Sequence, residues 1–307
     1  MRKKYSISFF ALGLVLLFIS ACGATATPGG TSSLTPLQVI QKSANTMKQL
    51  KSAHIELQST SNVQAAGATT GTPTSTTTPM ASNTTVNITG TGDEALPNLE
   101  QLKLTINQGT TIAEIVQEDK VYVQNAQGKW YVLNKSSLQG TIGNPFSGFN
   151  VDQNTLLALV QGSKIADHGD QLLNGHSLRH ITADLDRDGI RQLLKDNPQF
   201  SDGISQQNID AILDKAKTLE ASVDVWIDES KFYVHRTEVK LNLNADTSSV
   251  SGTPTTIGTV PTHIATKLDS IIDLSKFDDP VTIIPPTNAT PTTDPTIILS
   301  ETGANKP

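Results

Sequence analysis

The feature that most constrains the fold is a long succession of segments in which apolar and polar residues alternate. Alternation with a period of two is typical of half-buried β-strands, and it recurs over residues 99–133 and 165–272. Short polar turns separate neighbouring segments, among them Asn174-Gly175 and the run at 124–129. Closely spaced strands of this kind predict hairpins, because parallel neighbours need long crossover connections. The pattern therefore predicts one sheet of many antiparallel strands.

A few amphipathic helices are expected between these strands. Thr35 and Pro36 are typical of an N-cap and a first helical residue, and apolar residues then recur at helical spacing to about residue 51. The same spacing predicts a short helix after Asp152 and helices over residues 187–195 and 205–219. Because the strands do not alternate with crossover helices, the pattern indicates an α+β fold with its helices packed on one face of the sheet.

The amino terminus has the features of a bacterial lipoprotein signal. Basic residues 2–4 precede an uncharged apolar run over residues 6–19, which is shorter than the about 20 residues of a membrane-spanning helix. Small residues then lead directly to Cys22, where we expect a diacylglyceryl thioether, cleavage before the cysteine and acylation with a chain such as palmitate. Several acyl chains hold a protein firmly, whereas one binds reversibly. An ordinary secretory signal and an uncleaved membrane anchor are the alternatives.

Composition divides the chain into a folded part and polar segments. Hydrophobic residues make up 36% and charged residues 17% of the chain, below the roughly 45–50% and about 25% of a typical globular domain. Segments rich in Thr, Ser, Pro and Gly account for the shortfall, and they cannot bury an apolar core. We predict a signal peptide over residues 1–21, a flexible spacer over 22–34, a single domain over 35–284 with a disordered insertion at about 65–82, and a disordered tail over 285–307.

Charge and cysteine content exclude several classes of protein. The net charge of −6 provides no basic footprint for nucleic acid. A single cysteine permits neither an internal disulfide framework nor a cysteine-based zinc cluster. Acidic residues at 184–189 match the first half of a calcium-binding loop, but Lys195 stands where the loop needs a bidentate Glu. A helix cap is the better interpretation of this segment.

No pattern in the sequence supports catalysis. The chain has no Gly-x-Ser-x-Gly elbow, no phosphate-binding glycine loop and no dinucleotide fingerprint. His176 and His180 are four residues apart, but on a strand this spacing separates them by about 13 Å. With Cys22 bound to lipid, no thiol nucleophile remains. We therefore expect no enzymatic activity, no metal and no cofactor.

The order of several segments after the signal is informative. An opening helix at residues 37–44 leads through residues 50–54 into a strand, and an aromatic hairpin follows at residues 121–131. An acidic-aromatic strand at residues 223–228 then precedes a final acidic turn at residues 278–281. In this order, from residue 37 to about residue 285, the chain resembles the LppX/LprA/LprF/LprG lipoprotein family, which is related in fold to the LolA and LolB carriers. The resemblance implies a curved half-barrel of antiparallel strands, with helices over its concave face and an apolar cavity for acylated lipids.

The resemblance implies a monomeric lipoprotein that is anchored to the outer face of the bacterial cell membrane. Such a protein would bind the acyl chains of lipids or glycolipids and could carry lipids in the envelope. The alternative is a cavity-free interaction or sensor module on the same tether. The resemblance and the apolar periodicity suggest lining residues for the cavity: Leu50, Ile55, Leu57, Leu104, Val132, Leu157, Ile209, Ile212, Leu213, Val225 and Leu241.

Overall fold

The computed structural model describes residues 33–66, 81–125, 127–137, 163–196, 206–246 and 263–293. The strands in these residues are β1 (Ser52–Ala66), β2 (Ala81–Ala95), β3 (Leu99–Ile106), β4 (Thr110–Gln117), β5 (Lys120–Gln124), β6 (Trp130–Asn134), β7 (Ser163–Leu173), β8 (His176–Leu185), β9 (Ala216–Ile227), β10 (Val234–Asp246), β11 (His263–Ser275) and β12 (Thr290–Pro291). The helices are α1 (Pro36–Met47), α3 (Arg187–Asp196) and α4 (Gln206–Lys215), with a 3₁₀ turn η1 (Lys135–Ser137).

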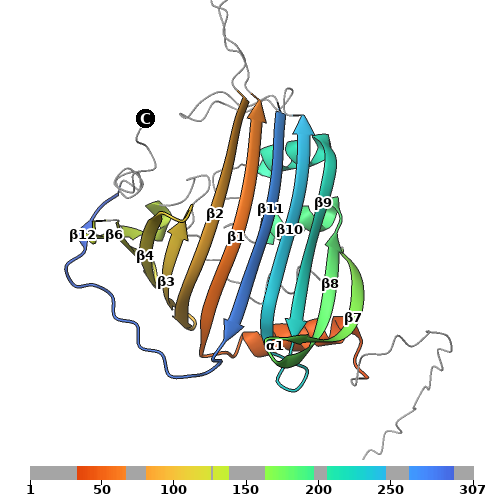
Figure 1. The fold of residues 1–307 in the computed structure, drawn as a ribbon, viewed down its shortest axis with the longest axis horizontal. Coiled ribbons are helices and arrows are strands. Elements are labelled where there is room, and N and C mark those ends of the chain that lie inside the picture. The colour runs from red at the N-terminus through yellow and green to blue at the C-terminus, as the bar shows by residue number, and fades with distance from the viewer. Residues whose placement is uncertain are drawn as a thin grey trace, which may run out of the picture.

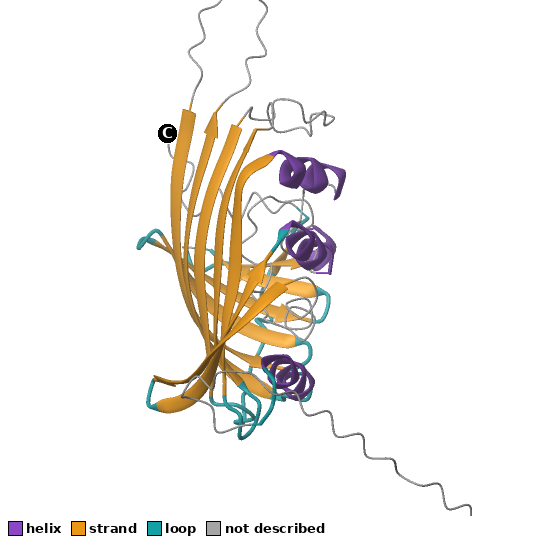
Figure 2. Cartoon of the chain, turned by 90° about the vertical axis from the view of Figure 1, so that its right-hand side faces the viewer, coloured by secondary structure: helices purple, strands orange, loops and turns teal. Residues whose placement is uncertain are grey.

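These strands form one 12-stranded sheet in the order β12-β6-β5-β4-β3-β2-β1-β11-β10-β9-β8-β7 (Figure 1). All neighbours are antiparallel except β12 and β6, which are parallel. The sheet is strongly curved, and the helices lie on its concave side (Figure 2). The α+β class, the antiparallel sheet and the position of the helices are therefore as the sequence predicts.

Helix α1 begins where the sequence predicts. The side chain of Thr35 accepts a hydrogen bond from the backbone N–H of Gln38, and the Gln38 side chain accepts one from the backbone N–H of Thr35. This reciprocal capping box satisfies donors that the first turn leaves free. The helix ends at Met47, a turn earlier than expected, and buries Val39 and Ile40 completely.

Helix α3 is also capped at its amino end, in this case by the acidic residue Asp186. Asp186 Oδ1 accepts a hydrogen bond of 2.8 Å from the backbone N–H of Gly189. The helix-cap interpretation of residues 184–189 is confirmed, because this carboxylate satisfies an amide of the first turn.

The centre of the sheet joins early and late segments of the chain. Strand β1 pairs with β2 on one side and with β11 on the other. The predicted pairing of the strand at 53–57 with the strand at 84–90 is confirmed, with Leu57 opposite Gly90. The hairpin strands reach further than predicted, since Ala65 pairs with Ser82 and Ala66 with Ala81. The rest of the predicted insertion lies outside the described residues.

Two segments differ from the sequence prediction. The helix expected to reach residue 219 ends at Lys215, and β9 begins at Ala216. The reason is tertiary: Leu219 lies opposite Leu243 of β10, so the apolar residues there serve a strand. The chain also follows a defined path from residue 285 to residue 293, within the expected tail, where Thr290 pairs with Tyr131 of β6.

The predicted tight turn between β7 and β8 is present. Asn174 and Gly175 have φ angles of 50° and 84°. Positive φ at both central residues defines the turn that matches the twist of a two-residue hairpin, and Asn and Gly tolerate it best. The turn sets the register of the residues next to it, where Leu172 lies opposite Ser177, and a register shift between Asp167 and Gly169 then places Ile165 opposite Ala183.

Candidate functional site

The concave face of the sheet is apolar across most of its width. A main cluster joins α1, α3 and α4 to the concave residues of β8, β9 and β11, and it extends through Leu57 on β1 to Leu102 and Leu104 on β3. A second cluster continues the face over the neighbouring strands; this β4–β6 cluster consists of Ile112, Val116, Val121, Val123, Tyr131 and Leu133. The described helices make their main contacts with β7, β8, β9 and β10, so the β4–β6 cluster faces them across the curve of the sheet (Figure 2).

One glycine shows how closely the side chains pack on this face. Gly90 lies between Leu57 and Leu104 in the register of β1, β2 and β3. A Cβ atom at Gly90 would lie 2.7 Å from Leu104 Cδ2 and 3.3 Å from Leu57 Cβ. The two leucines therefore approach each other across the position where β2 has no side chain.

Most of the predicted lining residues lie on this concave face or on the helices that cover it. Six of them are buried in the main cluster: Leu50, Leu57, Leu104, Ile209, Leu213 and Val225. Three are only partly buried: Ile55, Ile212 and Leu241. Partly buried apolar residues on an inner face are the ones that a ligand chain could still cover.

Three predicted site residues are not part of this set. Val132 alternates along β6 with Tyr131 and Leu133, which belong to the β4–β6 cluster, so Val132 lies on the opposite face. The prediction fails there because one residue of shift in a strand exchanges the faces. Leu157 and Cys22 lie outside the described residues.

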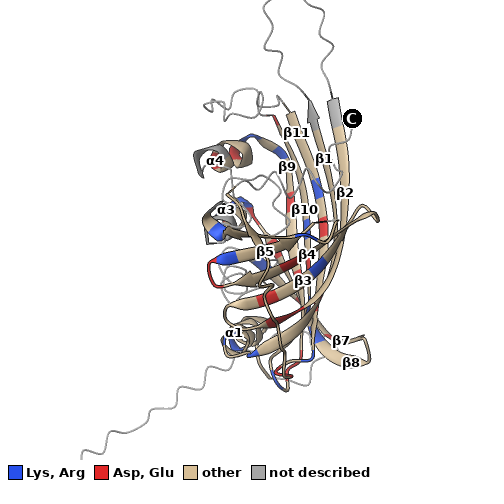
Figure 3. Cartoon of the chain, turned by 90° about the vertical axis from the view of Figure 1, so that its left-hand side faces the viewer, with Lys and Arg blue, Asp and Glu red and all other residues tan. Residues whose placement is uncertain are grey.

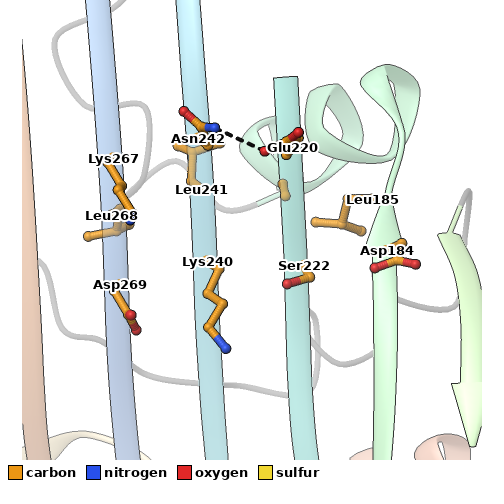
Figure 4. Close-up of a pocket in the computed structure, with 11 residues that line it drawn as sticks. Asp184, Leu185, Glu220, Ser222, Lys240, Leu241, Asn242, Lys267, Leu268 and Asp269 are labelled. Carbon is orange, nitrogen blue, oxygen red and sulfur yellow. Dashed lines mark hydrogen bonds between the residues drawn. The ribbon is translucent and has the colours of Figure 1, made fainter. Parts of the chain in front are cut away.

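The convex face carries a polar pocket instead. A pocket of about 560 Å³ is lined by residues of β8, β9, β10 and β11 (Figure 4). Its row of Asp184, Ser222, Lys240 and Asp269 runs across four paired strands, and each of these residues alternates with concave-face residues. Of the predicted lining residues, Leu241 also borders this pocket. Charged walls do not suit an acyl chain, so this pocket is no substitute for the concave face.

A stack of rings occupies another part of the convex face. The His180 ring lies between those of Trp226 and His168, with ring centroids 4.2 Å and 4.5 Å away. His180 Nε2 is 2.8 Å from Asp224 Oδ1, which also accepts a hydrogen bond from the Thr182 hydroxyl. The stack buries its own polar groups and encloses the histidine. A structural role for these histidines agrees with the sequence analysis.

Among the residues that the structure describes, no group of three or more His, Cys, Asp or Glu side chains could hold a metal ion. Within the same residues no helix combines the length and the apolar character needed to cross a membrane.

Several polar atoms on the concave face have no hydrogen-bond partner. Thr237 Oγ1 and Ser270 Oγ are buried without one, although both residues sit in register with core positions. Glu114 Oε2 is also unpartnered, and the Glu114 side chain is only 2% exposed. Buried polar groups are nearly always paired in folded proteins. Two further unpartnered atoms, His180 Nδ1 and Asn244 Oδ1, lie on the convex face, so the inner face carries three of the five among the described residues.

Three carboxyl groups lie close together at one end of this face. Glu94 on β2 pairs with Glu100 on β3, and Glu114 on β4 lies diagonally from Glu100. Figure 3 shows acidic residues in red on the strands of this arm. Burial, and then the charge of Glu100, raises the pKa of Glu94 to about 7. Burial raises the pKa of Glu114 well above its ordinary value, and the charge of Glu100 adds to this while Lys135 opposes it. Burial also raises the pKa of Glu100.

Sequence analysis missed this carboxyl cluster. One signal was present: Glu114 occupies the same face of its strand as Ile112 and Val116, where the period of two calls for an apolar residue. The approach of Glu94 and Glu100 depends on the register between β2 and β3 and on which face becomes concave. Those features belong to the tertiary structure.

Fold and site together define a protein built on one curved antiparallel sheet, whose apolar inner face is partly covered by helices. Residues 35–263 match a protein family described as "Family of unknown function (DUF6612)". Because this match spans most of the chain, the protein belongs to that family. Among curated proteins, none matches the sequence.

Comparison with solved structures finds lipoproteins of the type named from the sequence. The lipoprotein LppX of Mycobacterium tuberculosis has 16% identity and a TM-score of 0.44, over 81% of this chain and 97% of that chain. LprF of Mycobacterium bovis has 15% identity and a TM-score of 0.39, over 81% and 96%. A putative outer membrane lipoprotein-sorting protein domain of Vibrio parahaemolyticus has 10% identity and a TM-score of 0.25, over 80% and 93%.

Proposed function

We propose that the protein is an exported lipoprotein that binds lipid acyl chains against the concave face of its sheet, and that it is anchored through Cys22. The observation that carries this proposal is the extent of the apolar inner face. It continues from the main cluster to the β4–β6 cluster, beyond the strands that the described helices mainly cover. Burial of an acyl chain there would release about 25 cal/mol for each Å² of apolar area removed from water.

The unpartnered polar atoms on the same face support a ligand with a polar part. Ser270 Oγ and Thr237 Oγ1 lie among apolar neighbours and find no partner in the protein. A buried hydroxyl without a partner costs about 1–3 kcal/mol, and an ester or sugar group of a bound lipid would remove that cost. A purely structural core would favour apolar residues at both positions.

The route of the amino terminus supports a tether. The Arg179 guanidinium, which is 4% exposed, donates to the backbone carbonyl of Leu34 at 2.9 Å and also binds Asp167 and Glu229. This contact holds the chain just before α1 and defines where the spacer leaves the sheet. Eleven residues lie between Cys22 and Leu34, and a segment of this length spans about 40 Å when fully extended. A domain held in this way can turn freely above the membrane surface.

The test of ligand binding uses a matched pair of variants on β10. Leu241 is partly buried on the concave face, and its neighbour Asn242 is exposed on the convex face. We expect the wild-type protein to take up a fluorescent fatty-acyl probe and to retain lipid in native mass spectrometry. Leu241→Arg should weaken probe binding at least about tenfold, because a guanidinium cannot be desolvated beside an acyl chain. Asn242→Arg should bind as the wild type does.

The outcome of that experiment separates the two candidate functions. Absence of co-purified lipid together with absence of probe uptake would overturn the carrier proposal and leave the cavity-free interaction module. Equal weakening by both arginine variants would mean that the probe does not bind on the concave face. Thermal unfolding of both variants checks that each one folds.

The anchor is tested separately in the bacterial host. Labelling with a lipid precursor should mark the wild-type protein and should be lost in Cys22→Ala, which is also expected in the medium. Ser20→Ala is the matched control, because it changes the same segment and leaves the cysteine. Persistent labelling of Cys22→Ala would contradict attachment at this residue.

A further inference from the structure

Glu114 is a carboxyl group within an otherwise apolar surface. It lies between Ile112 and Val116 on β4, and it is opposite Leu102 on β3 and Val123 on β5. All four of these neighbours belong to the apolar clusters of the concave face. The carboxyl group therefore lies on the concave face, the side of the sheet to which we assign the ligand.

The protein does not compensate for the burial of this carboxyl group. Glu114 is 2% exposed, and its Oε2 atom has no hydrogen-bond partner. Breaking up an apolar surface with an unpaired carboxylate costs several kcal/mol. The buried guanidinium of Arg179, by contrast, forms hydrogen bonds with three other residues. A buried carboxyl group with an unpartnered oxygen, in a protein whose buried guanidinium is well paired, indicates a group that serves something other than the fold.

Two further carboxyl groups converge on the same place. Glu94 is 6% exposed and lies directly opposite Glu100, which acts electrostatically on both Glu94 and Glu114. Directly opposed side chains on antiparallel strands have Cβ atoms about 4.5–5.5 Å apart, and like charges there repel. Lys135, at the end of β6, is the one cation among the described residues that acts on Glu100 and Glu114. One lysine cannot neutralise three carboxylates.

We propose that Glu94, Glu100 and Glu114 form an acidic site on the concave face that binds the ammonium group of an amine-bearing lipid, whose acyl or alkyl chain lies along the apolar clusters. The inference rests on the proposed function and adds the class of head group. An ammonium group has three N–H donors and one positive charge, which match an unpartnered Glu114 oxygen and three carboxyl groups that, among the described residues, share only Lys135 as a cation. Charge-assisted hydrogen bonds of this kind are about twice as strong as neutral ones.

A series of ligands with one chain and three head groups tests this proposal. The probes are dodecylamine, dodecanol and dodecanoic acid, each below its critical micelle concentration, in competition with the fluorescent acyl probe at pH 8. Because the chain is the same, differences in affinity report the head group alone. We expect the amine to bind at least about tenfold more tightly than the alcohol, and the alcohol more tightly than the acid.

Variants of the carboxyl groups assign the effect to the site. Glu114→Gln keeps the shape and removes the charge, so it should abolish most of the preference for the amine and leave dodecanol binding unchanged. Glu118→Gln is the matched control, because Glu118 is exposed at the turn after β4. This control should keep the full preference.

The outcomes distinguish this inference from the proposed function. If none of the three probes binds, the proposed function itself fails, and the inference fails with it. If all three bind with similar affinity, or if the alcohol or the acid binds best, chain binding stands and the acidic site is overturned. An amine preference that survives in Glu114→Gln and in Glu94→Gln would also overturn it, because the preference would then arise elsewhere.

Discussion

The two arms of the curved sheet treat buried charge in opposite ways. On the β7–β9 arm, Arg179 binds Asp167, Glu229 and the carbonyl of Leu34, and Asp224 accepts hydrogen bonds from its neighbours. On the β2–β4 arm, Glu94, Glu100 and Glu114 lie on the same face in adjacent register, and Glu114 Oε2 is buried without a hydrogen-bond partner. Paired buried charges hold elements together, whereas unpaired ones cost stability. The first arm therefore serves the fold, and the contrast agrees with our proposal that the second arm serves a ligand.

The largest expected effect comes from breaking the paired arm. Arg179→Leu leaves Asp167 and Glu229 without their cation and releases the segment before α1. We expect the free energy of unfolding to fall by about 2–4 kcal/mol, since Asp167 stays partly solvated. Denaturant titration measures this change. Arg191→Leu is the control, because Arg191 pairs with Asp210 and Asp214 at the surface and should matter far less. Equal losses in the two variants would contradict the distinction.

The unpaired arm predicts an unusual dependence of stability on pH. Because the pKa of Glu94 is about 7 in the folded protein and 4.5 ordinarily, Glu94 stays protonated to a higher pH in the folded state than in the unfolded state. Glu94 should therefore leave the free energy of unfolding unchanged below pH 4.5 and lower it progressively between pH 4.5 and about 7. Above about pH 7 its contribution should stay constant. A shift of this size corresponds to about 3–4 kcal/mol.

Glu94→Gln should remove most of that slope. Glu118→Gln, in which an exposed carboxyl is replaced, should keep it. The measurement is a set of denaturant titrations from pH 4 to pH 8 without added ligand. A wild-type stability that rises over this interval would contradict the assignment of raised pKa values to the buried carboxyl groups.

Replacing the unpaired carboxyl by an apolar residue should stabilise the protein. Glu114→Leu places an apolar side chain between Ile112 and Val116, so we expect a gain of about 1–3 kcal/mol at pH 8. Arg179→Leu, by contrast, is expected to destabilise the protein. Opposite signs of the change in unfolding free energy for these two leucine variants are the most direct test of the difference between the two arms. Loss of stability in Glu114→Leu would show that the carboxyl group serves the fold.

The smallest effect concerns buried hydroxyl groups. Ser43 Oγ donates a hydrogen bond of 2.8 Å to the carbonyl of Phe232, whereas Ser270 Oγ has no partner. Ser43→Ala should cost about 1–2 kcal/mol, whereas Ser270→Ala should stabilise the protein by about 1 kcal/mol, because it removes an unpartnered buried hydroxyl. Thermal unfolding of the two variants tests whether the unpaired polar groups of the concave face are dispensable for folding. A loss of stability in Ser270→Ala would contradict this.

Local patterns were sufficient for features that depend on neighbouring residues. Thr35 and Pro36 predict the start of α1, and Asn174-Gly175 predicts the turn between β7 and β8. The end of α4 was predicted too late, because Ala216 and the residues after it suit a helix until β10 supplies a partner. Val132 was assigned to the wrong face for a similar reason, since alternation alone does not say which face turns inward.

The sequence by itself determined the class of the fold, the hairpin order of most strands and the expected anchor at Cys22, because these depend on periodicity and on adjacent residues. Only the tertiary structure decided that β1 and β11 meet at the centre of the sheet, and that three carboxyl groups converge on its concave face. Both depend on pairings between residues far apart in the chain, and the curvature of the whole sheet sets which side chains face one another.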